Sequence, residues 1–385
     1  MAHCNTIFAQ MLKLIPRHVF GKLEAEHGAG RPARTFSRWS QFVLLTFMQL
    51  TGRVSLRDGI AGLTAQCRRL YHLGASLVSR STFADANNRR PASFYQALFG
   101  LFYQRCEPRS PAHRFKFNNK LYSLDATVVK LCLNLFPWAS FRRTKGAIKL
   151  HTVLDHDGYL PAFVTITEGR RHEAKVAALP RLPRGSIVVV DRAYTDYSWF
   201  ARLRQSGLFF VIRQKTNALY QVCEERPVPR RSGVTADQTI RLTGPKASSY
   251  PHLLRRVCYT DPETGKEYVY LTNNFRLSPK TIADIYKERW QIEVFFRWIK
   301  QNLKIKAFLG NTENAVMTQI YVALIAYLLL CYFKLLSGLN ISLQNLIRLL
   351  HLNLFRTCTL KELLEPPPLG SYNINDSRQL SLNIA

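Results

Sequence analysis

The stretch YKERWQIEVFFRWIK (Tyr286–Lys300) places an acid in an apolar setting. Glu293 is flanked on both sides by tryptophan, isoleucine, valine and phenylalanine side chains. At about 100° per residue on a helix, Tyr286, Arg289 and Lys300 all fall within about 40° of Glu293. The spacing therefore predicts a helix with one polar stripe and aromatic packing faces. The simpler alternative is an ordinary i,i+4 ion pair between Arg289 and Glu293, a very common feature of helices.

Two further acids interrupt β-rich segments upstream of this helix. The segment LYSLDATVV (121–129) holds Asp125 in an apolar strand, and SIVVVDRAY (186–194) holds Asp191 directly after four β-branched residues. A buried acid is costly unless a cation neutralises it. Each aspartate taken alone could simply cap a helix or pair with a basic residue. Only a fold that brings two strand ends beside a helix would unite both aspartates with Glu293.

The chemistry of these three acids indicates a metal site. Three hard oxygen ligands without histidine or cysteine suit Mg²⁺, and Mn²⁺ is able to substitute. Two such ions about 4 Å apart support phosphodiester displacement. We therefore predict that Asp125, Asp191 and Glu293 are catalytic and bind metal. Arg289 and Lys300 would hold flanking phosphates, and Tyr286 would contact a phosphate or stack on a base.

The surrounding segments predict a mixed sheet. Residues 121–168 form three β-rich runs, the last two joined by the tight-turn sequence His156–Tyr159. Residues 172–213 alternate helical and β patterns, with a helix expected at 172–179. A hairpin followed by strand and helix alternation makes a mixed sheet with helices on its faces. Residues 216–277 read as a β-rich insertion, after which Ser278 and Pro279 begin a long helix.

The N-terminal region, residues 1–110, reads as helical and basic. Residues 55–70 and 79–88 have the outline of two helices joined by a short turn, as in a helix-turn-helix, although a plain packing pair has the same outline. The apolar segment 315–333 is uncharged, but its strictly apolar part is too short to span a bilayer, which favours a buried core helix.

The charge of the chain indicates a polyanionic partner. The 385 residues include 54 Lys and Arg against 25 Asp and Glu, a net charge of +29. Nucleic acid is the first candidate and an anionic membrane surface the second. The eight cysteines are scattered without zinc spacing and indicate reduced thiols in a cytosol. No secretory signal is expected at the N-terminus.

The motif Tyr286, Arg289, Glu293, Lys300 resembles, in residue types and spacing, the YREK signature of bacterial insertion-sequence transposases of group four. These are DDE enzymes of the RNase H-like superfamily. DRAYTD after Asp191 resembles the motif that follows their second catalytic aspartate, and Asp125 resembles the first. The resemblance covers roughly residues 115–335.

The resemblance implies an α/β fold, an RNase H-like mixed sheet flanked by helices and interrupted by a mostly β insertion, with an N-terminal helical DNA-binding region. The expected units are 1–110 for DNA ends, 115–215 and 278–340 for the catalytic core, 216–277 for the insertion, and 341–385 for a C-terminal helical region and tail.

The same resemblance implies a cytoplasmic, nucleoid-associated enzyme that moves an insertion sequence by cut-and-paste. Its partners would be double-stranded DNA, at the terminal inverted repeats and the target, and a second copy in a synaptic homodimer, with no membrane. Two alternatives stay open. One is a nuclease or resolvase without strand transfer, and the other is an inactive DNA-binding regulator.

Some residues carry weaker predictions. Lys304 and Lys306 would extend the phosphate track or form a solvated face. His151 and His172 lack ligand spacing and read as ordinary core or surface histidines. Relatives that use DNA hairpins place a base-stacking tryptophan in the insertion, which here has none. A tyrosine would replace it, from the set Tyr220, Tyr250, Tyr259, Tyr268 and Tyr270. Trp290 and Trp298 would pack or turn toward a base.

Overall fold

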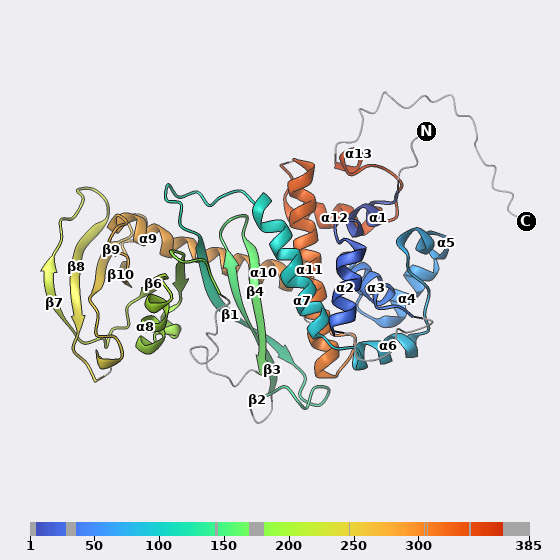
Figure 1. Ribbon diagram of the computed structural model, residues 1–385, viewed down its shortest axis with the longest axis horizontal. Helices are drawn as coiled ribbons and strands as arrows, with labels where there is room; N and C mark the ends of the chain where they lie inside the picture. Colours follow the sequence, from blue (N-terminus) through green and yellow to red (C-terminus); the bar gives the residue numbers. More distant parts are fainter. Residues whose placement is uncertain are drawn as a thin grey trace, which may run out of the picture.

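The computed structural model describes residues 5–27, 36–142, 145–168, 181–245, 247–303, 305, 307–338 and 340–364. The molecule is elongated, and a sheet-rich half lies beside a helical half (Figure 1). The expectations for a helix at 172–179 and for Lys304 and Lys306 fall outside the described residues.

The N-terminal region is helical, as predicted. Its α-helices are α1 (Ile7–Leu12), α2 (Arg17–His27), α3 (Arg38–Leu50), α4 (Leu56–Thr64), α5 (Cys67–Leu70), α6 (Arg80–Arg89) and α7 (Ser93–Cys106). The expectation of one helix over residues 55–70 is wrong. Gln66, with φ −113° and ψ 21°, leaves the helical region and separates α4 from α5. Gly74, at φ 62°, then turns the chain toward α6.

The predicted mixed sheet is present. Its first strands are β1 (Leu121–Leu131), β2 (Ser140–Arg142), β3 (Lys145–Asp155), β4 (Leu160–Glu168), β5 (Ile187–Val190) and β6 (Phe209–Arg213). β1, β3 and β4 form an antiparallel meander, and β5 and β6 run parallel to β1. The predicted hairpin turn joins β3 to β4, and Gly158 there adopts φ 73°. The order β4-β3-β1-β5-β6 is the RNase H-like arrangement.

Helices cover both faces of the parallel part of the sheet, which explains its continuous apolar runs. On one face, Val188 and Val190 pack with α8 (Tyr197–Gln205), where Phe200 stacks on Phe210 at 4.3 Å between ring centroids. On the other face, Ile187 and Val189 join the cluster that includes buried residues of α9 (Pro279–Glu288).

The insertion is β-rich, as predicted, and it continues the core sheet. Its strands are β7 (Tyr220–Glu225), β8 (Val234–Leu242), β9 (Leu254–Thr260) and β10 (Glu267–Thr272). β10 returns to pair with β6, so ten strands form one sheet. Inside it, Arg255 binds both oxygens of Asp237 at 2.8 and 2.7 Å, and also the carbonyl of Leu277 at 2.6 Å. This buried pair ties the insertion to the start of α9.

The long helix expected after Ser278 is divided in two. Ser278 caps α9 and Pro279 is its first residue, as predicted. α9 ends before Arg289, and α10 (Trp290–Asn302) follows. At the junction the Arg289 N–H donates to the carbonyl of Tyr286 at 3.2 Å, three residues back, which tightens one turn.

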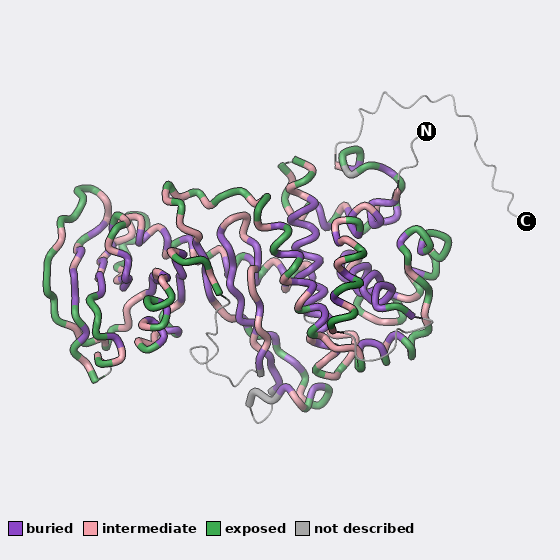
Figure 2. Tube along the Cα trace, viewed as in Figure 1, coloured by how far each residue is buried: buried purple, intermediate pink, exposed green. Residues whose placement is uncertain are grey.

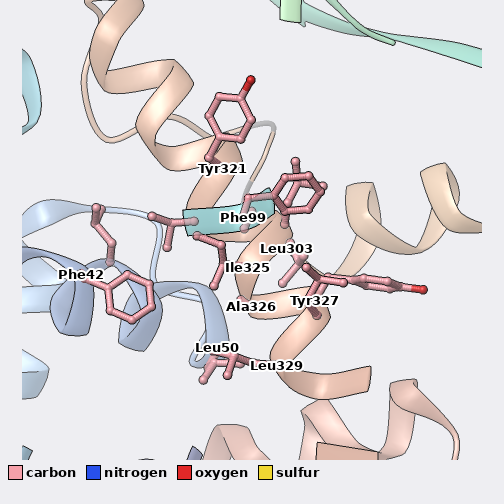
Figure 3. Packing of buried hydrophobic residues seen from close by; sticks show 14 of the residues in the cluster. Phe42, Leu50, Phe99, Leu303, Tyr321, Ile325, Ala326, Tyr327 and Leu329 are labelled. Atoms are coloured by element: carbon pink, nitrogen blue, oxygen red, sulfur yellow. The ribbon is translucent and has the colours of Figure 1, made fainter. Parts of the chain in front are cut away.

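The C-terminal helices complete the helical half. They are α11 (Glu313–Ser337), α12 (Leu343–Asn353) and α13 (Leu360–Leu364). α11 packs against α3 and α7, and Figure 3 shows Ile325 and Leu329 of α11 in the cluster that contains Phe42, Leu50 and Phe99. Buried residues run along α11 and the neighbouring strands (Figure 2). α11 is long and apolar enough to cross a membrane, but 78% of its most hydrophobic window is buried inside the protein. It is the core helix that the sequence predicted.

Candidate active site

Sheet register places the two predicted aspartates side by side. β1 and β5 are parallel, and Leu124 of β1 lies opposite Val190 of β5. Asp125 and Asp191 are the next residues along each strand, and neighbouring strands lie about 4.8 Å apart. Asp191 ends β5 and begins a short 3₁₀ turn, where its Oδ1 accepts from the N–H of Ala193 at 2.9 Å.

Glu293 reaches the same region from α10 through Arg289. The Arg289 guanidinium donates to Oδ2 of Asp125 at 2.8 Å and to Oε1 of Glu293 at 2.7 Å. The side chains of Asp125, Arg289 and Glu293 are 19%, 13% and 34% exposed. The i,i+4 pair therefore exists, but it is one arm of a bridge between the central strand and the helix. Asp191 is not part of this bridge, but its charge and that of Glu293 both act on Asp125.

The electrostatics of Asp125 reflect this crowding. Burial raises the pKa of its carboxyl to about 6, and the negative charges of Asp191 and Glu293 add to the rise. Arg289 and the N–H of Ala126 oppose it. A nearby positive charge stabilises the ionised form of a carboxyl group in this setting. The site thus favours a cation among its three acids.

The remaining residues of the predicted polar stripe also face this site. Lys300 donates to Oγ1 of Thr127, two residues after Asp125 on β1. Tyr286 is half-buried, with its ring 4.8 Å from that of Tyr270 and the Arg289 guanidinium 5.8 Å from its centroid. Arg289 and Lys300 thus contact side chains of β1, whereas Tyr286 packs on Tyr270 of β10.

The two tryptophans of α10 have different environments. Trp290 is 51% exposed, and the Arg297 guanidinium lies 5.7 Å from its ring centroid. Trp298 is half-buried, and its ring centroid lies 5.2 Å from that of Tyr327 on α11. Trp298 packs in the core, whereas Trp290 is available at the surface beside Glu293.

The five tyrosines predicted as candidates for base stacking differ in how far their side chains are buried. Tyr250, Tyr259 and Tyr270 are 1%, 8% and 3% exposed and are parts of the core. Tyr220 and Tyr268 are half-buried, so part of each side chain stays accessible.

Sequence reasoning missed the role of Glu288. Its side chain is 6% exposed, binds Arg114 at 2.6 Å and accepts from the hydroxyl of Tyr159 at 2.7 Å. This acid fixes the end of α9 against the β3–β4 hairpin. No local signal distinguished it, because both partners lie far away in sequence. His151, which donates to or accepts from Thr167 at 3.0 Å and is 4% exposed, is a core histidine as predicted.

The donor set suits a divalent cation. Among the described residues, no three acidic, histidine or cysteine side chains lie together closely enough to hold a metal ion. However, the Arg289 guanidinium lies between Asp125 and Glu293, so the space between these acids accommodates a positive group. Oxygen-only ligands are those that Mg²⁺ and Mn²⁺ prefer. The chemistry of these oxygen donors therefore suits such an ion.

Comparison with known proteins gives consistent matches. A family model described as a transposase DDE domain matches residues 117–329, and one described as a domain of unknown function (DUF4372) matches residues 3–76. A protein of Sinorhizobium fredii named as transposase y4zB is 32% identical over 291 residues, 74% of this chain and 80% of that protein. A protein of Geobacillus stearothermophilus, named as a transposase for insertion sequence element IS5377, is 34% identical over 271 residues, covering 69% of this chain and 70% of that one.

A chain of the piggyBac transposase synaptic complex with hairpin DNA aligns with a TM-score of 0.45 and 14% identity, over 94% of this chain and 82% of that one.

Proposed function

The chain belongs to the DDE transposases of bacterial insertion sequences, and from this premise we propose that Asp125, Asp191 and Glu293 are its catalytic acids. As a member of this family it is a DNA transposase, an enzyme that cleaves and joins DNA strands. The observation that carries the proposal is that Arg289 joins Asp125 of β1 to Glu293 of α10, while Asp191 follows the neighbouring strand β5 beside Asp125.

The family uses divalent metal ions, and we assign two Mg²⁺ ions to these acids, with Mn²⁺ able to substitute. When bound, the ions would activate the attacking oxygen and stabilise the leaving one. Asp125 would supply a ligand from within β1, and Asp191 would supply one from the position just after β5. Glu293 supplies one from α10, which is anchored by the buried side chains Ile292, Phe295, Phe296 and Ile299.

The proposed reaction has two displacements at phosphorus. At each element end a water oxygen attacks, a new P–O bond forms, and the bond to the 3′ oxygen breaks to leave a free 3′ hydroxyl. That hydroxyl then attacks a target phosphodiester, forms a P–O bond and releases a target 3′ hydroxyl. Arg289 and Lys300 would hold the phosphates on either side of the reacting one, because both are cations that contact β1 beside Asp125. Tyr286 would contact the same DNA strand. Lys304 remains a predicted contact to a phosphate further along the DNA.

Several features support DNA as the partner. The net charge is +29, and the matched relatives are named as transposases. We infer that the chain acts in the bacterial cytoplasm at the nucleoid, as a homodimer with one subunit at each terminal inverted repeat.

The decisive experiment uses full-length protein and the duplex fragments that flank its gene, with Mg²⁺. We expect cleavage at the element ends and joining of precut ends to a plasmid target. Asp191→Asn should abolish both reactions while DNA binding persists. Cleavage by Asp191→Asn would disprove the triad assignment.

A matched pair of substrates separates a transposase from a nuclease or resolvase. Precut ends with a 3′ hydroxyl should be joined to target, whereas identical ends with a 3′ deoxy terminus should not, because they lack the nucleophile. Cleavage without any joining would support a nuclease. Salt-sensitive binding without any metal-dependent product would support an inactive regulator.

A further inference from the structure

The helix α6 of the N-terminal region has one packed face and one polar, exposed face. α6 packs on the protein through one apolar face, and Asn88 beside that face accepts from the hydroxyl of Thr312 at 2.9 Å. Phe83 packs edge-on against Phe36 at 6.0 Å between centroids, and Asn87 Oδ1 accepts from Gln41 at 2.7 Å. The backbone carbonyl of Asn87 also accepts from Asn314 of α11 at 2.9 Å. α6 is therefore held rigidly on α3 and α11, at the edge of the helical half (Figure 1).

The opposite face of α6 is polar and exposed. It presents Ser81, Asp85 and Arg89, with the partly buried Ala84 among them, and Arg80 is exposed at the first turn. None of the exposed large apolar side chains of the described residues lies on α6. Such a face does not suit a protein partner or a lipid surface, both of which would bury apolar groups. Arginine, aspartate, asparagine and serine are side chains that hydrogen-bond to base edges in the major groove.

A basic groove adjoins the start of this face. Its lining comes from the first turns of α4 and α6, with a volume of about 550 Å³, and its residues are Ser55, Leu56, Arg57, Arg80, Ser81 and Ala84. Arg57 and Arg80 are both exposed, and they belong to the two helices that form the groove. Residues 51–90 contain seven arginines and two aspartates, so this surface complements a polyanion.

We propose that α6 is the helix that reads bases at the element ends, and that Arg57 of α4 holds a backbone phosphate beside it. This proposal rests on the proposed function, because it takes the element ends as the DNA. α6 has ten residues and is about 15 Å long, a length that fits along the major groove. Arg80 donates to a base edge, and Asp85 accepts from a base amino group. Arg57 contacts the backbone and contributes affinity without sequence preference.

The test compares binding of full-length protein to two duplexes of equal length: the fragment that flanks the gene and a shuffled version of it. Arg80→Ala should weaken binding to the flanking duplex by about tenfold or more and leave the shuffled duplex nearly unchanged. Arg57→Ala should weaken binding to both duplexes equally. It should also reduce the dependence of affinity on salt concentration by about the amount that one phosphate contact contributes. Lys22→Ala is the control, since it removes one exposed positive charge from α2, which does not line the groove, and it should change binding to neither duplex.

The outcomes separate the possible failures. Base reading by α6 would be overturned if Arg80→Ala bound both duplexes like the unmodified protein. It would also be overturned if Arg80→Ala weakened binding to both duplexes equally. Asp85→Asn offers an independent check, because it should change the preferred base at one position of the flanking duplex. Asp191→Asn should retain full discrimination between the duplexes. If it instead cleaves DNA, the triad proposal fails while the assignment of α6 stands.

Discussion

The guanidinium of Arg289 joins Asp125 to Glu293, donating to one at 2.8 Å and to the other at 2.7 Å. This contact links β1 to α10, the second helix after the insertion. Arg289 binds the same oxygens that we assign to the metal ions. Its positive charge therefore competes with a divalent cation for these two acids.

Replacing Arg289 with glutamine should strengthen metal binding and weaken catalysis. Without the guanidinium, the two acids repel each other and gain more from a cation. We expect Mn²⁺ to raise the melting temperature of Arg289→Gln more than that of the unmodified protein, measured without DNA. Strand transfer should fall about tenfold or more, because a phosphate contact is lost. Arg297→Gln, an exposed arginine on the same helix, is the control and should show the unmodified metal response. An equal response from Arg289→Gln would contradict competition at this site.

Lys300 and Thr127 should act as a unit. Thr127 accepts from Lys300 and orients its ammonium group at the end of the site. Lys300→Met should reduce strand transfer about tenfold or more, and Thr127→Val should reduce it less. The double variant should be no worse than Lys300→Met alone, because Thr127 acts through the lysine. Lys130→Met, exposed on the same strand, controls for the lost charge. Additive losses would show that Thr127 has a separate role.

The two tryptophans of α10 should respond oppositely to truncation. Trp290 is exposed, so Trp290→Ala should leave the melting temperature nearly unchanged. We expect its exposed ring to stack on a base of the bound DNA, and base stacking contributes about 1–3 kcal/mol. Cleavage of flanking DNA by Trp290→Ala should therefore fall. Trp298→Ala should instead lower stability by on the order of 3 kcal/mol, because it removes a ring packed on Tyr327. Normal cleavage by a stable Trp290→Ala protein would exclude the stacking role.

Local sequence patterns predicted much of this fold. Apolar runs with β-branched residues located β1 and β5, and Ser278 with Pro279 located the start of α9. The same patterns located Asp125 and Asp191 at the strand positions where they lie. These features depend on the periodicity of a few neighbouring residues, which a single sequence displays directly.

Other features depend on contacts between distant segments, and no local pattern revealed them. The return of β10 to β6 extends the core sheet into the insertion, yet the β10 sequence reads only as a strand without a partner. The bridge from Arg289 to Asp125 crosses 164 positions. The break at Arg289 was hidden because the residues on both sides favour helix. Register and nonlocal pairing therefore set the geometry of the candidate site.

The buried His156 should make the chain sensitive to mild acid. It is 1% exposed, and its Nε2 lies 2.7 Å from the hydroxyl of Ser123, while its buried Nδ1 finds no hydrogen-bond partner among the described residues. Burial lowers the pKa of His156 to about 3, the positive charges of His113 and Arg114 add to this, and Asp157 opposes it. The folded chain thus binds this proton less well than the unfolded chain, whose histidine has a pKa of about 6.5.

Between pH 6.5 and pH 3, unfolding therefore takes up a proton at His156, and the free energy of unfolding falls as the pH falls, by up to about 1.4 kcal/mol per pH unit. His156→Gln should be less stable at pH 7 but lose less stability on going to pH 5, as measured by urea unfolding at each pH. The exposed His18 provides the control, and His18→Gln should keep the full acid sensitivity. If His156→Gln keeps the full acid sensitivity as well, a group other than His156 takes up the proton on unfolding, and the buried neutral imidazole is not the cause.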